Sequence, residues 1–434
     1  MKRMYVKLTA TAMATLMAAG MLGGTTVFAE EQKTTIRLLT TNPLVSEDAI
    51  ALFEEENPDI EVDYEYVSRN DYSAKFSALA AAGEVPDVFW TQSAYIKDQV
   101  DQGLLMDITE DLKGQNYEED AVWEDTFIEA LMDNYKNAMK TTLGEDETGL
   151  YGVPFSMTTI AVLYDKNLYD ELGLTEPQDW DSFMNNCETI KEAGYVPLSL
   201  QVNWLDWYPR LFWDQYCREE LEADPDAWAD GTMTFESESV KKGLEAYKDL
   251  WDKGYLPENG ITAELETMQQ MFCQKKLAQF LIAPDKLEYI LENAPEDMSL
   301  ATFAFPGIAG LEPRSLGGSS NIFGISADTE NKDAALKLLK FLTSKTMFTS
   351  SDVLKYSNSG LNNVEADPAA EQLMAGFTEA ANGGFCPETM VPTTLNTEIN
   401  ESFMKDLLPN YLLGDYDLDY VTSELQSIYE DTKE

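Results

Sequence analysis

Strand-like and helix-like segments alternate along the chain from residue 34 onward, and this alternation limits the possible folds more than any other feature. The segments are, in order, a strand at 34–41, a helix at 46–56, a strand at 60–67, a helix at 71–82, a strand at 85–90 and a helix at 93–102. Helices of about 10–15 residues between strands are typical of βαβ units with parallel strands. The sequence therefore predicts an α/β fold with parallel βαβ units in a doubly wound sheet.

The same alternation returns later in the chain. Further segments are helices at 180–193, 263–274 and 331–344 and strands at 195–200, 277–282 and 321–325. One sheet containing so many strands would be large for a single domain. The sequence therefore predicts two α/β lobes of ordinary domain size.

Charge and composition exclude several classes of protein. The 434 residues include 30 Lys and Arg against 78 Asp and Glu, a formal net charge of −48, and no histidine. Binding to nucleic acid requires clustered Lys and Arg, so no nucleic-acid partner is expected. Catalytic triads and dyads that depend on histidine, and histidine-ligated zinc, are excluded. The acidic balance favours a neutral or cationic ligand over an anionic one, unless local charge overrules it.

The amino end has the layout of an export signal. Lys2, Arg3 and Lys7 precede an uncharged run that extends through residue 29 and ends in Val27-Phe28-Ala29. This pattern predicts cleavage near Ala29, with an uncleaved membrane anchor as the alternative. We therefore expect residues 1–29 to be a signal peptide and the mature protein to be secreted or extracytoplasmic, at the outer face of the cytoplasmic membrane.

Four cysteines leave two interpretations open. Cys187, Cys217, Cys273 and Cys386 could form two disulfides in an oxidising compartment, or remain four small buried side chains. No CxxC motif occurs, so neither a thiol redox site nor a zinc site is expected. No cysteine precedes Cys187, which excludes a lipid-modified cysteine at the amino end.

A set of short motifs occurs in one order along the chain. The motifs are FSALAAAGEVPDVFW at 76–90, YGVPFS at 151–156, LYDKNL at 163–168, PQDWDSF at 177–183, FPG at 305–307, FGIS at 323–326, KDAALKLLKFL at 332–342 and LGDY at 413–416. In this order and spacing they resemble the extracellular solute-binding proteins of carbohydrate ABC importers, the family that includes maltose- and oligosaccharide-binding receptors.

The resemblance implies a two-lobe, type II periplasmic-binding-protein fold with a hinge and a cleft between the lobes. Its implied boundaries are residues 30–156 and 319–355 for lobe 1 and residues 161–315 and 360–434 for lobe 2. Hinge closure around a sugar would then present the closed form to an ABC permease. We expect a monomeric receptor that is not an enzyme and needs no cofactor or metal.

Aromatic and polar residues occur where strands are predicted to end, the edge at which open α/β sheets bind ligands. Trp90 ends one strand, and Gln92 and Ser93 follow it. A sugar needs aromatic planes for its C–H faces and paired donors and acceptors for its hydroxyls. The position of Trp90 resembles that of a sugar-stacking tryptophan in the family; the alternative is a core tryptophan under the next helix.

The richest local signal follows the first predicted strand of lobe 2. It consists of Asn203, Trp204, Asp206, Trp207 and Tyr208. On a helix these residues spread over more than one face, so they cannot all point into a cleft. Trp204 is the first candidate for sugar stacking, followed by Trp207 and Tyr208, while one or more of these aromatic rings packs in the core.

The remaining candidates are polar. Thr41 and Asn42 end the first strand and are either cleft residues or part of a turn, and Asp71 is either a ligand contact or a helix cap. Ser319 and Ser320 follow two glycines at an implied lobe crossing. Asp285 stands where many family members have an aromatic residue; it could accept ligand hydroxyls, or cap the helix predicted at 286–292.

Two other functions stay open at this point. A secreted glycoside hydrolase would need two carboxylates about 5–10 Å apart. With 78 acidic residues such a pair can be imagined anywhere, so composition alone does not favour it. The third possibility is a binding protein for a non-sugar polar or cationic solute.

Overall fold

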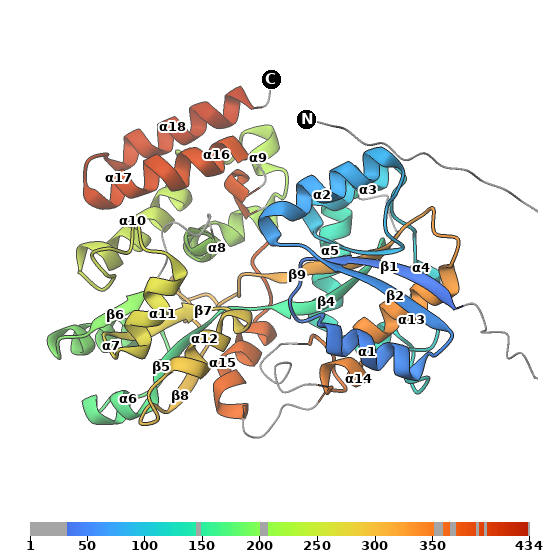
Figure 1. The fold of residues 1–434 in the computed structure, drawn as a ribbon. Coiled ribbons are helices and arrows are strands. Elements are labelled where there is room, and N and C mark those ends of the chain that lie inside the picture. The colour runs from blue at the N-terminus through green and yellow to red at the C-terminus, as the bar shows by residue number, and fades with distance from the viewer. Residues whose placement is uncertain are drawn as a thin grey trace, which may run out of the picture.

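The computed structural model describes residues 33–144, 149–199, 207–350, 359–364, 370–387, 390–394 and 397–432. Its strands form two separate β-sheets, and helices pack around each of them (Figure 1). The fold is therefore α/β with two sheet-centred bodies, as the alternation of strands and helices predicts.

The first sheet has the strand order β2-β1-β3-β9-β4. Its strands are β1 (Thr34–Thr40), β2 (Ile60–Tyr66), β3 (Val88–Thr91), β4 (Val153–Thr158) and β9 (Gly318–Ile325). β1 pairs in parallel with β2 and β3, whereas β9 pairs antiparallel with β3 and β4. The three strands of the predicted βαβ units are therefore parallel, whereas β9 is antiparallel because it returns from the other sheet without a crossover helix that would set a parallel direction.

The second sheet has the order β6-β7-β5-β8. Its strands are β5 (Ala161–Asp165), β6 (Val196–Ser199), β7 (Leu277–Ile282) and β8 (Leu300–Phe303). β6 and β7 are parallel, and β5 is antiparallel to both β7 and β8. Every residue of β5 and β7 is buried, which explains why these strands are almost continuously apolar in sequence.

The helices fill the intervals between the strands. Those of the first half are α1 (Glu47–Glu56), α2 (Arg69–Ala82), α3 (Ser93–Asp101), α4 (Thr109–Leu112), α5 (Glu129–Leu143), α6 (Lys166–Leu172), α7 (Trp180–Glu192) and α8 (Trp207–Ala223). Those of the second half are α9 (Ala227–Asp230), α10 (Glu238–Asp252), α11 (Leu265–Cys273), α12 (Glu288–Asn293), α13 (Lys332–Leu342), α14 (Lys345–Phe348), α15 (Glu371–Asn382), α16 (Thr397–Ser402), α17 (Leu408–Leu413) and α18 (Leu418–Asp431).

Local sequence signals account for the clearest helix boundaries. Ser46 Oγ accepts a hydrogen bond from the Ala49 N–H (3.2 Å) and thereby caps α1, whose first turn carries Glu47 and Asp48. The helix predicted from Lys286 begins later, at Glu288, with Leu287 at its N-cap. Asp285 lies in the 3₁₀ turn Pro284–Lys286 that precedes α12.

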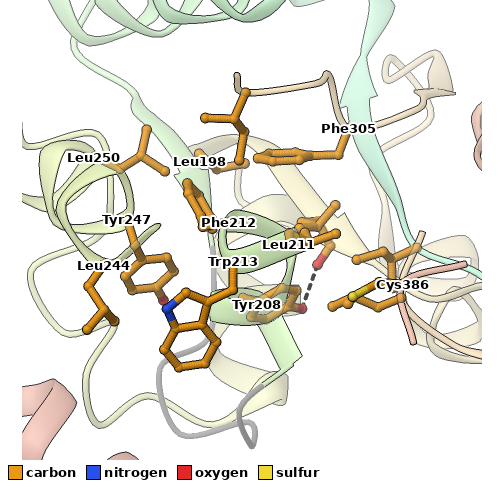
Figure 2. Close-up of a cluster of buried hydrophobic side chains, with 14 of the residues drawn as sticks. Leu198, Tyr208, Leu211, Phe212, Trp213, Leu244, Tyr247, Leu250, Phe305 and Cys386 are labelled. Atoms are coloured by element: carbon orange, nitrogen blue, oxygen red, sulfur yellow. Dashed lines mark hydrogen bonds between the residues drawn. The ribbon is translucent and has the colours of Figure 1, made fainter. Parts of the chain in front are cut away.

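Separate hydrophobic cores stabilise the two bodies. One cluster surrounds the first sheet, and the other two lie around the second. Figure 2 shows α8 at the centre of the largest cluster, where Phe212 meets Tyr247 edge-to-face at a centroid distance of 5.1 Å. Trp213 is fully buried beside them and donates its indole N–H to the Val240 carbonyl at 3.1 Å.

The cysteines are free thiols. Cys187, Cys217 and Cys386 are buried, and Cys273 is partly exposed. Burial raises the pKa of both Cys187 and Cys217 to about 12. The interpretation as small core side chains is therefore confirmed for the three buried cysteines, and the disulfide alternative is wrong.

The predicted signal peptide, residues 1–29, lies outside the described residues. Among the helices that the structure does describe, none has the length and apolarity needed to cross a membrane.

Gly317 allows the chain entering β9 to pass close to the end of β4, and its replacement should lower the stability of the fold. A Cβ atom there would lie 2.2 Å from the Thr158 carbonyl oxygen, at a φ of +111°. Gly310 also has a positive φ, +81°, but a Cβ atom added to Gly310 would meet no atom within 4 Å. We expect Gly317→Ala to lower the free energy of unfolding by clearly more than the ~1 kcal/mol of backbone strain expected for Gly310→Ala. Urea denaturation of both variants measures the difference; equal losses would contradict it.

Candidate functional site

The ends of several strands gather at one edge of the first sheet. β1, β3 and β4 run in the same direction, because β3 and β4 are both antiparallel to β9 and β1 is parallel to β3. Their carboxyl ends therefore lie on one edge, at which β9 begins. Open α/β sheets bind ligands outside this edge.

The second sheet presents the matching edge. β6 and β7 end where β5 begins, since Ala161 pairs with Ile282. Only Thr159 and Ile160 separate the end of β4 from the start of β5. The carboxyl edges of the two sheets are thus brought together by a two-residue connection, which we call the crossing.

Ser315 ties the crossing together. Its hydroxyl accepts a hydrogen bond from the Ile160 N–H (2.9 Å), while its backbone N–H donates to the Gly384 carbonyl (2.9 Å) and its carbonyl accepts from the Cys386 N–H (2.8 Å). A cavity of about 10 Å³ beside Ser315 is close to the smallest that holds one water. Three segments distant in sequence are therefore fixed to one another here.

Trp90 lies in the core in this structure. Only 1% of its surface is exposed, and the Tyr72 ring packs edge-on against it at 5.1 Å between centroids. Its indole N–H donates to Asn321 Oδ1 (3.1 Å), and Asn321 Nδ2 donates to Thr158 Oγ1 (3.3 Å). The contacts are those of the core alternative, and they link the ends of β3, β9 and β4.

The aromatic segment before α8 is only partly described. Asn203, Trp204 and Asp206 lie outside the described residues, and Trp207 is the first residue of α8. Tyr208 is 1% exposed and donates its hydroxyl to the Leu281 carbonyl at 3.0 Å, near the end of β7. Burial raises the pKa of Tyr208 above its ordinary value, so the hydroxyl stays a donor.

The polar candidates of the first sheet occupy different environments. Asn42 is buried, and its Oδ1 accepts the Leu44 N–H at 3.0 Å, as in a turn. Ser319 is also buried, and its N–H and hydroxyl both donate to Asn134 Oδ1, at 3.0 and 2.9 Å. Asp71 is exposed in the first turn of α2 and accepts a hydrogen bond from Ser68 Oγ, while Ser68 itself is the N-cap residue.

Four candidates are placed by their backbone. Gln92 is the N-cap residue of α3 and Ser93 its first residue, at the end of β3. Ser320 lies in β9, near the crossing. Asp285 follows β7 by three residues. These positions follow strand ends or lie near them, as the sequence predicts.

Three buried hydroxyls at these strand ends lack hydrogen-bond partners. They belong to Thr41 after β1, Thr159 in the crossing and Ser199 at the end of β6. Of the three, the sequence analysis did not select Thr159 and Ser199. Their signal was position alone: a hydroxyl side chain at the last residue of a buried strand, or directly after one. A polar group buried without a partner destabilises the fold by about 1–3 kcal/mol, which marks these hydroxyls as ligand candidates.

Two α/β bodies whose strand ends meet at a short crossing define the class of two-lobed, type II binding proteins. Comparisons agree: the sugar-binding protein MalE of Xanthomonas citri has the same fold, with a TM-score of 0.71 at 17% identity, over 92% of this chain and 97% of that one.

Sequence comparisons identify the family. The profile of the bacterial extracellular solute-binding proteins matches residues 35–347. A putative binding protein of Brucella abortus is 27% identical over 68% of this chain and 67% of its own length. The multiple sugar-binding protein of Streptococcus mutans is 24% identical over 79% of this chain and 75% of its own length. The chain belongs to the bacterial extracellular solute-binding protein family.

The hydrogen bond between Trp90 and Asn321 gives a test of the site's scaffold. Asn321→Ala leaves a buried indole N–H without this acceptor, so we expect the free energy of unfolding to fall by about 1–3 kcal/mol. Asn331→Ala is the control, because no capping hydrogen bond of the Asn331 side chain is present and its loss should stay within about 0.5 kcal/mol. Chemical denaturation compares the two; equal stability would argue against the bond.

Proposed function

We propose that the protein is the extracytoplasmic receptor of an ABC importer. It binds a sugar or oligosaccharide between its two lobes and delivers it unaltered by hinge closure. The observation that carries this proposal is the meeting of two carboxyl strand edges at a two-residue crossing, with buried hydroxyls that lack partners. Ligand binding there joins the lobes, and closure follows if the closed form binds the ligand more tightly.

Carbohydrate is the cargo that relatives and chemistry favour together. The name of the Streptococcus mutans relative and that of the Xanthomonas citri structure both specify sugar binding. A polyol presents many hydroxyls, each of which needs a donor or acceptor once water is excluded. Thr41, Thr159 and Ser199 offer such groups at the strand ends.

We propose the lobe boundaries with one refinement. Lobe 1 comprises residues 30–156 and a second segment that begins at residue 319, and lobe 2 comprises residues 161–315 and the carboxyl-terminal part of the chain. Leu361 bridges to Phe127, and the Ile128 N–H donates to the Gly360 carbonyl at 2.8 Å. These contacts favour a third passage between the lobes after Leu361, rather than near residues 355–360.

We propose Trp204 as the principal stacking residue, with Asn203, Asp206 and Trp207 beside it. All four precede α8 or begin it, where β6 delivers the chain to the carboxyl edge of the second sheet. The first sheet would contribute Gln92 and Ser93 from the matching edge. Trp90 would support this edge through Asn321.

The proposed function also requires that the protein is exported. We propose that residues 1–29 are removed as a signal peptide and that the mature receptor works at the outer face of the membrane, beside its permease. The charge pattern of Lys2, Arg3 and Lys7 before an uncharged run supports this location.

A thermal-shift panel of mono- and oligosaccharides tests the function. A ligand present at 100 times its Kd stabilises the folded protein by roughly 2.7 kcal/mol, so a true cargo raises the melting temperature clearly. Trp204→Ala should abolish the shift. Trp251→Ala should preserve it, because Trp251 packs partly buried against the core of the second body.

Chromatography of the same mixtures separates receptor from hydrolase. A receptor leaves every saccharide intact after prolonged incubation, whereas cleavage products would contradict the proposal. The absence of a shift with every saccharide would contradict carbohydrate as the cargo.

A further inference from the structure

The carboxyl edge of the first sheet is a row of strand ends, and β2 belongs to it because β2 pairs in parallel with β1. The strand order places β2 at one end of the row and β4, which leads into the crossing, at the other. Four intervals between neighbouring strands separate β2 from β4, a distance of about 19 Å at about 4.8 Å per interval. In Figure 1 this edge faces the second body. The row is longer than a single sugar ring.

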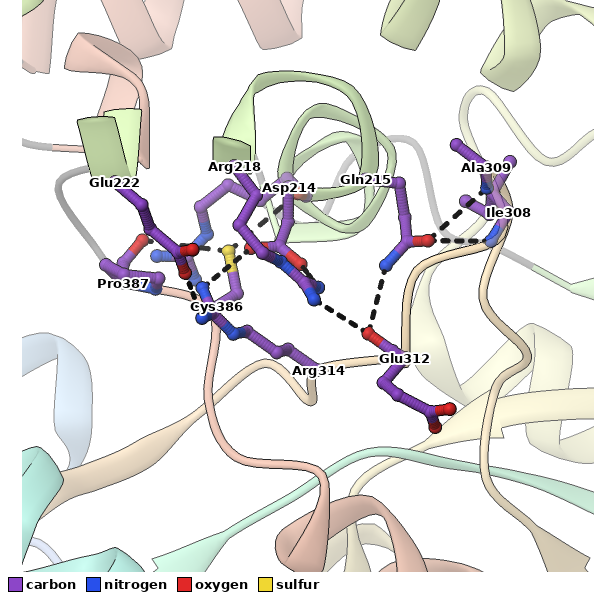
Figure 3. Close-up of polar contacts among 11 residues, drawn as sticks. Asp214, Gln215, Arg218, Glu222, Ile308, Ala309, Glu312, Arg314, Cys386 and Pro387 are labelled. Carbon is purple, nitrogen blue, oxygen red and sulfur yellow. Dashed lines mark hydrogen bonds and ion pairs between the residues drawn. The ribbon is translucent and has the colours of Figure 1, made fainter. Parts of the chain in front are cut away.

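The crossing end of the row is filled by packed chain. Figure 3 shows the segment that leads back toward β9 lying against α8. Gln215 Oε1 accepts the Ile308 N–H at 2.9 Å. Arg218 Nη1 donates to the Glu312 carbonyl, also at 2.9 Å. The cavity of about 10 Å³ beside Ser315 holds at most one water, so a sugar ring has no space there. A cargo that begins at the crossing would therefore extend along the row toward β2.

Tyr66 stands at the far end of the row. It is the last residue of β2 and pairs with Thr40 of β1. Its side chain is 49% exposed, and within the described parts of the chain it forms no hydrogen bond and no contact with another aromatic ring. Gln92, partly exposed directly after β3, lies between Tyr66 and the crossing. An aromatic side chain that solvent reaches therefore ends the row.

Position distinguishes Tyr66 from the other exposed apolar side chains. The large apolar side chains that are exposed among the described residues also include Val122, Leu413 and Tyr420. Val122 lies between α4 and α5, whereas Leu413 and Tyr420 belong to α17 and α18. Tyr420 packs on the Tyr416 ring at 4.7 Å between centroids. Of these four exposed side chains, only that of Tyr66 lies at a carboxyl strand edge, where open α/β sheets bind ligands.

The backbone that carries Tyr66 is held in place by its neighbours. The Val67 N–H, directly after the strand, donates to the Thr40 carbonyl at 2.8 Å. Tyr64, two residues before Tyr66, donates its hydroxyl to the Val45 carbonyl at 2.6 Å. A tyrosine ring loses little conformational entropy on binding, because it has only two χ angles. Tyr66 therefore offers a flat apolar face to a ligand at a low entropic cost.

We propose that Tyr66 is the outer stacking residue of an elongated cargo site, and that the cargo is an oligosaccharide rather than a monosaccharide. This inference rests on the proposed sugar-binding function and narrows it. The C–H face of a sugar ring packs on the negative face of an aromatic ring. One sugar unit cannot span the distance of about 19 Å between the crossing and the end of β2, whereas several linked units can.

A series of saccharides of increasing length tests the proposal. Isothermal titration would measure glucose, maltose and maltotetraose, and likewise galactose, raffinose and stachyose, against wild type, Tyr66→Ala, Tyr66→Phe and Tyr420→Ala. Tyr420→Ala is the matched control, because Tyr420 is also an exposed tyrosine but lies on α18. We expect wild type to bind the longest member of at least one series more tightly than the monosaccharide of that series.

Tyr66→Ala should weaken the binding of that longest member by about 5- to 10-fold, the loss expected when one aromatic contact is removed. Its affinity for shorter members that bind without reaching β2 should match that of wild type. Tyr66→Phe keeps the ring and should bind like wild type, as should Tyr420→Ala. The melting temperature of ligand-free Tyr66→Ala should stay close to that of wild type, because the side chain removed is half exposed and forms no hydrogen bond.

The outcomes separate the inference from the function on which it rests. Unchanged binding of the longest member by Tyr66→Ala, or an equal loss in Tyr420→Ala, would overturn the inference and leave the sugar receptor intact. An equal loss in Tyr66→Phe would assign the effect to the hydroxyl and overturn stacking. A monosaccharide that wild type binds as tightly as the longest member of its series would overturn the oligosaccharide cargo. A failure of every saccharide to bind would overturn the receptor proposal and the inference together.

Discussion

The pairing of β4 with β9 is the constraint on which the rest of the structure depends. β4 lies at the edge of the first sheet, and after two residues the chain enters the second sheet as β5. β9 returns beside β4, so outgoing and returning chains run together through the crossing. The close approach of Gly317 to the Thr158 carbonyl is possible because glycine has no Cβ. The strand ends of both sheets meet for this reason.

Local patterns in the sequence predict the individual helices and strands, whereas they do not predict which distant strands pair with one another. The strand predicted at 277–282 matches β7, and the helix predicted at 46–56 matches α1 with its Ser46 cap. These signals lie within a few residues of one another. The antiparallel β9 depends on contacts with β3, more than 200 positions earlier in the chain, which no local periodicity records. The prediction that α12 begins at Lys286 is wrong for a similar reason: Pro284 begins a 3₁₀ turn that the apolar pattern does not reveal, and the helix starts at Glu288.

The same distinction between local signals and long-range contacts applies to the candidate site residues. The sequence located the strand ends, and with them Gln92, Ser93 and Ser320, because a strand end is a local event. It could not decide whether Trp90 faces ligand or core, since that depends on Tyr72 and on Asn321 from a distant strand.

Buried polar groups without hydrogen-bond partners, located where the chain crosses between the lobes, suggest how the protein selects its ligand. Each buried hydroxyl without a partner raises the free energy of the conformation that buries it, by about 1–3 kcal/mol. A ligand that supplies the missing partner removes this penalty only in a conformation that assembles the strand ends of both sheets. It therefore binds that conformation more tightly, and a difference in affinity between two states is the condition under which a ligand shifts their populations. A ligand without matching groups gains no such difference, however well it fits one lobe. Selectivity would then reside in the closing step as much as in the contacts of either lobe, and groups such as Thr159 and Ser199 would act on both.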